Sequence, residues 1–83
     1  MKYPIYAWRD IKVGFGALHI EANEEVAKRN FGYELNRSDS VMEYAASDYE
    51  LYQIGEYDTQ SGRISPLELP LFVVCGADMI GGK

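Results

Sequence analysis

Residues 47–64, SDYELYQIGEYDTQSGRI, decide the fold, because an aromatic and β-branched run stops at a turn signal and then resumes. This pattern predicts a β-hairpin. Tyr49 and Leu51 are expected on one face, with Tyr52 and Ile54 mainly on the other. The loop is expected at residues 58–62, where Gly62 accepts a positive φ without steric cost.

A second hairpin is predicted at the start of the chain. Residues 3–9 are rich in aromatics, and residues 15–21 alternate again after Gly14. The loop between them, DIKVG at 10–14, shares the pattern Asp-x-x-x-Gly with DTQSG at 58–62. The two ends of the sheet are therefore expected to be built alike, unless the shared pattern is a coincidence of common turn residues.

A helix is predicted from about residue 24 to 36, because Asn23 can cap it and apolar residues then recur at helical spacing. Those apolar residues are Val26, Ala27, Phe31 and Leu35, while Lys28 and Arg29 are expected on a solvated outer side. Ser40 to Glu43 fits a capping box, which predicts a short second helix through Ala46.

The C-terminal part of the chain contains prolines that restrict its structure. Pro66 and Pro70 exclude a central strand, so residues 71–75 are expected to form either a short edge strand or a buried turn. The predicted fold class is α+β, a small antiparallel sheet in ββαββ order with one main helix on one face. A single domain is expected over 1–83, ordered from about 3 to 78, with a flexible tail at 79–83.

One helix leaves the other face of the sheet open. Ile5 and Ala7 are apolar, yet Tyr6 and Trp8 on the opposite side of the same strand are apolar too. The second face therefore needs a cover, either a partner subunit, the chain's own C-terminal segment or a stacked ligand. With only 83 residues to build a core, a homo-oligomer, a dimer in the first instance, is expected.

Composition restricts the partners and the compartment. Thirteen acidic residues against eight basic ones give a net charge of −5, which disfavours nucleic acid except through a local basic stripe. Cys75 is the single cysteine, and no signal pattern opens the chain, so a reducing host cytoplasm is expected. The longest apolar run, residues 69–77, is too short to span a bilayer, so no membrane association is expected.

No constellation of catalytic residues is visible, so no enzymatic activity is expected. His19 is the only histidine and is expected to be an exposed strand residue, so neither a metal site nor another cofactor is predicted. Cys75 lies in an apolar run and is expected to be a buried, inert thiol.

Aromatic and basic residues interleave on the two predicted hairpins. Aromatic rings on a sheet can stack the bases of a single strand while Arg and Lys contact phosphates. The alternative is that these aromatics belong to a core or a dimer interface. The candidate nucleic-acid-binding residues are Tyr6, Trp8, Arg9, Lys12, Tyr52 and Arg63.

Several pieces in order resemble one known family: YAWRD at 6–10, Gly14-Phe15, the helix opened by Asn23, DYELYQIGEYD at 48–58, and Ser61-Gly62. Over residues 3–68 the chain resembles the small nonstructural protein of gokushovirus-type microviruses, which are single-stranded DNA phages. The resemblance implies a role in the viral DNA cycle, as a single-stranded DNA-binding protein or a switch from replication to packaging. The alternative is an acidic oligomeric adaptor that regulates replication or assembly by binding viral or host proteins.

Overall fold

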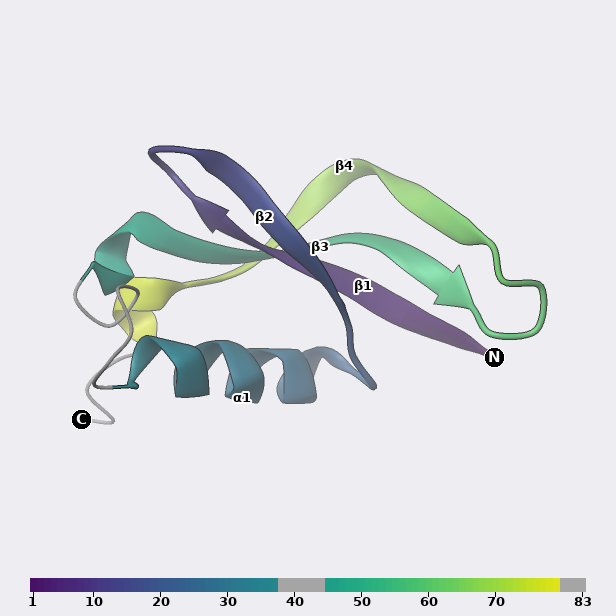
Figure 1. Cartoon of the computed structure of the whole chain (residues 1–83), viewed down its shortest axis with the longest axis horizontal. Helices are drawn as coiled ribbons and strands as arrows, with labels where there is room; N and C mark the ends of the chain where they lie inside the picture. Colours follow the sequence, from purple (N-terminus) through teal and green to yellow (C-terminus); the bar gives the residue numbers. More distant parts are fainter. Residues whose placement is uncertain (38–44, 80–83) are drawn as a thin grey trace.

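The computed structural model describes residues 1–37 and 45–79, and its fold is α+β as predicted. Within these described residues, four antiparallel strands form one sheet in the order β2-β1-β3-β4, and one α-helix lies along one face of the sheet (Figure 1). The elements are β1 (Lys2–Asp10), β2 (Gly14–Ile20), α1 (Glu24–Leu35), β3 (Tyr49–Asp58) and β4 (Ile64–Cys75), with two 3-10 turns, η1 (Ala46–Asp48) and η2 (Gly76–Asp78).

The loops of the two hairpins are built alike, as their shared pattern predicts. The carboxylate of Asp10 accepts the backbone N–H of Lys12, and that of Asp58 accepts the N–H of Gln60, each at 2.9 Å. Each loop ends on a glycine with positive φ, +125° at Gly14 and +75° at Gly62. The N–H of Gln60 is also the main cause that lowers the pKa of Asp58.

The main core cluster lies between the sheet and α1, while Ile5 and Ala7 of β1 are buried on the other face of the sheet. The Asn23 side chain accepts the N–H of Val26 at 2.9 Å and so begins the helix where the sequence predicts. Phe31 and Leu35 are fully buried against Leu51 of β3 and Tyr6 of β1. This cluster also contains Ala27 and Ala46, and it is flanked by Trp8, Tyr49, Val73, Val74 and Met79.

β4 is longer than predicted. It is an edge strand, as its prolines require, but it runs for twelve residues from Ile64 and is neither a short strand nor a buried turn. Proline is tolerated because an edge strand needs no N–H donor on its outer side. The pairing with β3 is irregular at this point, since Gln53 lies opposite Leu71 while Gly55 lies opposite Pro66.

The predicted short helix falls mostly outside the described residues. Of its length, 45 and 46 are described, and Ala46 opens the 3-10 turn η1. The predicted tail is described only at Met79, which packs against the core. Within residues 1–37 and 45–79, no helix has the length and apolar character needed to cross a bilayer.

The second face of the sheet carries apolar side chains, as expected. The register places three rows of residues on this face. Each row contains one residue from each strand, in the order β2, β1, β3, β4. We call this surface the open face, because α1, Ala46 and Met79 all pack on the other side. Its rows are Ile20-Ile5-Gly55-Pro66, Leu18-Ala7-Tyr52-Phe72 and Phe15-Arg9-Glu50-Cys75.

Candidate nucleic-acid interface

Three aromatic rings cross the open face from one edge of the sheet to the other. Phe15 of β2 packs edge-on against Tyr52 of β3, with ring centroids 5.2 Å apart and planes at 77°. Tyr52 packs in the same way against Phe72 of β4, at 5.6 Å and 77°. We call these three residues the aromatic row. Phe15 is 48% exposed and Phe72 is 55% exposed, so much of both rings is open to solvent.

One ion pair lies beside two members of the aromatic row, Phe15 and Tyr52. Nη1 of Arg9 donates to Oε1 of Glu50 at 2.8 Å, and the two residues lie directly opposite each other on β1 and β3. The guanidinium carbon of Arg9 lies 5.9 Å from the centre of the Phe15 ring, and the Tyr52 hydroxyl donates to Glu50 at 3.2 Å. The hydrogen bond to Glu50 raises the pKa of Arg9, so the charge of Arg9 is permanent but already partly compensated.

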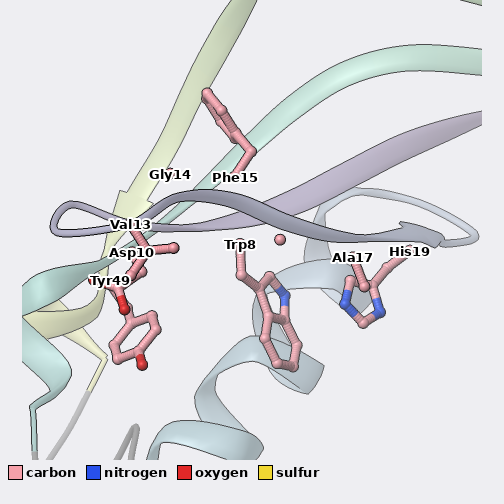
Figure 2. Close-up of a pocket in the computed structure, with 9 residues that line it drawn as sticks. Trp8, Asp10, Val13, Gly14, Phe15, Ala17, His19 and Tyr49 are labelled. Atoms are coloured by element: carbon pink, nitrogen blue, oxygen red, sulfur yellow. The ribbon is translucent and has the colours of Figure 1, made fainter.

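Tyr6 and Trp8 lie on the opposite side of the sheet from the aromatic row. Tyr6 is 2% exposed within the core, and burial, with help from the charges of Glu24 and Glu21, raises its pKa. Figure 2 shows Trp8 projecting toward the helix side while Phe15 projects away from it. Neither Tyr6 nor Trp8 therefore shares a surface with Tyr52.

Trp8 is held by two neighbouring rings. His19 stacks on it at 4.5 Å with an interplanar angle of 18°, and Phe31 packs against it at 5.8 Å and 56°. The prediction of an exposed His19 is thus wrong, because His19 is half-buried in this stack. A base that stacked on the same side of Trp8 would have to displace the imidazole.

A hollow of about 330 Å³ lies beside Trp8, under the β1–β2 hairpin (Figure 2). Tyr49 forms part of its wall, and burial, followed by the influence of Asp10 and Asp48, raises the pKa of Tyr49. The hollow offers aromatic surface, but Trp8 is the one candidate residue that borders it.

Lys12 and Arg63 lie at opposite ends of the molecule. Lys12 is in the loop after β1, and Arg63 is in the loop before β4, which lies beside the start of β1. β1 separates them by about 26 Å, taking roughly 3.3 Å for each of its residue steps. Both side chains are exposed, and neither forms an ion pair with another described residue.

The six candidate residues are therefore divided among four places. Arg9 and Tyr52 meet on the open face, Tyr6 and Trp8 lie on the helix side, and Lys12 and Arg63 are at the two ends. The structure adds Phe15 and Phe72, which sequence reasoning did not select. Phe15 directly follows the turn glycine Gly14, so its place at the start of a strand could be predicted. The place of Phe72 could not, because the nearby prolines argued against a regular strand there.

Cys75 is the remaining reactive group that the sequence singles out. Cys75 is half-buried rather than buried, and it lies opposite Glu50 at the edge of the open face. Among residues 1–37 and 45–79, no three His, Cys, Asp or Glu side chains are grouped in a way that could hold a metal ion.

Comparison with models of protein families gives a match over most of the chain. The family described as Phage ORF5 protein matches residues 3–79, which extends through β4 and η2 and beyond the region of sequence resemblance. Searches of curated proteins and of solved structures found no match.

Proposed function

The chain belongs to the Phage ORF5 protein family, and from this premise we propose that it binds single-stranded DNA on the open face of its sheet. The proposal places the protein in the DNA cycle of a microvirus of the gokushovirus type, in the host cytoplasm. Its role there is to hold single-stranded genomes during replication or at the switch to packaging.

The aromatic row is the observation that carries the proposal. Exposed aromatic rings on a sheet are the usual platform for stacking the bases of a single strand, and every base has a face that such rings can contact. Phe15 and Phe72 are each about half exposed at opposite ends of the row. Tyr52, fixed between them by two edge-on contacts, keeps the platform rigid.

The charges around the platform favour weak, salt-sensitive binding. Arg9 is the cation nearest to the row, but Glu50 occupies one of its donors. Lys12 and Arg63 are free of ion pairs with described residues and lie beyond the two ends of β1. Because the net charge is −5, we expect modest affinity at physiological salt and tighter binding as salt is lowered.

Phe72→Ala tests the stacking contact. Loss of one stacking ring costs about 1–3 kcal/mol, so we expect affinity for oligothymidylate to fall by roughly 5- to 150-fold with little change in salt dependence. Fluorescence anisotropy of a labelled oligonucleotide measures this. Tyr33→Ala is the matched control, because Tyr33 is 70% exposed on α1, away from the open face. Equal affinities for the two variants would exclude the aromatic row as the platform.

Lys12→Ala tests the phosphate contact. Removing one phosphate partner should reduce the slope of log K against log salt by about 0.7 for a single strand. The same titrations, repeated from about 20 mM salt upward, give this slope, since the screening length is then roughly 20 Å and any cation has a long reach. If the wild-type protein does not bind even at that salt concentration, the DNA proposal fails.

The acidic adaptor is the second candidate function. One observation favours it: the cation closest to the aromatic row is already paired with Glu50, so the open face is largely apolar rather than basic. A protein partner would bury such a surface with no need for phosphate contacts. If the protein does not bind DNA at low salt, the adaptor function replaces single-stranded DNA binding as the proposal.

A further inference from the structure

We propose that β2 is a dimerisation edge, at which a second copy of this chain pairs antiparallel with it about a two-fold axis. The two four-stranded sheets then become one continuous sheet.

β2 lacks the proline and the charged side chains that commonly protect an edge strand. Such strands are usually blunted by charged side chains, proline or bulges that twist the edge away. The sequence of β2 is GFGALHI, with no proline and no acidic or basic side chain other than His19. Its one irregularity is a bulge at residues 16–17, where two residues of β2 lie opposite Trp8 of β1, so the regular part of the strand is its C-terminal end. No described residue pairs with its outer edge.

β4 at the other edge is protected. Pro66 and Pro70 remove two N–H donors, and Glu68 lies between them. The pairing of β4 with β3 is also shifted by several residues at this point. A second copy therefore has one edge without proline or charge available, and self-pairing of that edge gives a closed dimer rather than an open filament.

The backbone of β2 offers unpaired groups at its outer edge. The N–H of Glu21, directly after β2, donates inward to the carbonyl of Pro4 at 3.2 Å. Because hydrogen-bonding directions alternate along an antiparallel strand, the N–H and C=O groups of Leu18 and Ile20 point outward. A two-fold axis beside Leu18 pairs Leu18 with its own copy and brings Ile20 opposite the bulged segment of the partner, at Gly16.

Charge favours a second copy as the occupant. A two-fold axis brings each segment close to itself, so a charged strand would repel its own copy. Of the four strands, β2 alone contains no Asp, Glu, Lys or Arg. Leu18 and Ile20 are 55% and 51% exposed, so pairing also removes apolar surface from water.

Such a dimer extends the proposed DNA platform. A two-fold axis perpendicular to the sheet keeps both open faces on the same side, with the two Phe15 residues near the junction. The aromatic rows of both copies then form one surface, a consequence that rests on the proposed function, although the dimer itself does not.

Leu18→Lys tests the dimer, because it places two like charges beside the axis. We expect the wild-type protein to approach twice its chain mass of 9.4 kDa by light scattering as concentration rises from about 1 µM to about 1 mM. Leu18→Lys should stay at one chain mass with an unchanged circular dichroism spectrum. Leu69→Lys is the matched control, because Leu69 is 75% exposed on β4, away from β2. The Leu69→Lys variant should dimerise like the wild-type protein.

A crosslink tests the register even if Leu18→Lys fails to fold. In a Cys75→Ser background, Leu18→Cys should form a disulfide dimer under mild oxidation, because opposed residues of a hydrogen-bonded pair lie within disulfide range. Leu69→Cys in the same background should not. A monomeric wild-type protein over the whole range, or equal crosslinking of the two variants, would overturn the proposal. All these measurements are made without DNA, so a dimer that binds no DNA refutes only the proposed function.

Discussion

Phe31→Ala is expected to lower the free energy of unfolding by about 3–5 kcal/mol, the usual cost of truncating a fully buried Phe. Phe31 has no exposed surface and lies where α1 meets the sheet. Its ring packs against Trp8 at 5.8 Å, which in turn carries the stacked His19. The substitution therefore leaves a cavity beside Trp8 and His19, and a movement of α1 alone cannot fill it.

Lys28→Ala is the control on the same helix. Lys28 forms one partly exposed ion pair with Glu24 at 3.8 Å, and such pairs contribute little to stability. Urea unfolding followed by circular dichroism should show a large loss of stability for Phe31→Ala and a change within about 0.5 kcal/mol for Lys28→Ala. For a small domain with a few kcal/mol in total, the first variant is expected to be partly unfolded without denaturant. A mild effect of Phe31→Ala would contradict the helix packing described above.

The parts of the fold that local signals specify were predictable. Asn23 begins α1 by accepting the N–H of Val26, and Gly14 and Gly62 end the two hairpin loops with positive φ. The buried positions of α1 follow from helical spacing, so Phe31 and Leu35 were also identifiable. Each of these features depends on residues within a few positions of one another, which is the range that a sequence pattern describes.

The candidate site depends on longer-range geometry. Alternation puts Tyr6 and Trp8 on one side of β1 and Arg9 on the other, but which side receives the helix is decided by packing. The irregular register between β1 and β3 then brings Ala7 opposite Tyr52, and a second shift brings Phe72 beside it. Bulges of this kind move the side chains of a whole strand segment to the other face of the sheet. The aromatic row could therefore be predicted only in part from the sequence.

Gly76 has the least room for a side chain among the described glycines, and its role was not apparent from the sequence. It opens η2 directly after β4 and is buried against η1, about thirty residues earlier in the chain. A Cβ atom on Gly76 would overlap the carbonyl oxygen of Ala46 and lie 2.9 Å from that of Tyr49. The Ala46 carbonyl in turn accepts the N–H of Tyr49, where β3 begins.

Gly76→Ala is therefore expected to destabilise the fold by about 3 kcal/mol, the upper end for an overpacked site. The added methyl group meets backbone atoms, which cannot rotate away as a flexible side chain would. Relief requires η1 and η2 to separate, which weakens the contact of Ala46 and Met79 with the core. Urea unfolding at a low micromolar protein concentration measures the change without a contribution from dimerisation.

Gly16→Ala is the matched control, because it makes the same chemical change where there is room. A Cβ atom on Gly16 would lie 3.5 Å from the Trp8 carbonyl oxygen, an ordinary van der Waals contact, and the φ of Gly16 is not positive. Its effect should lie between neutral and a gain of about 1 kcal/mol, because alanine restricts the unfolded chain. If Gly76→Ala were as well tolerated as Gly16→Ala, η1 and η2 would not be in contact through Gly76, and the anchoring of the C-terminal segment under the sheet would be refuted.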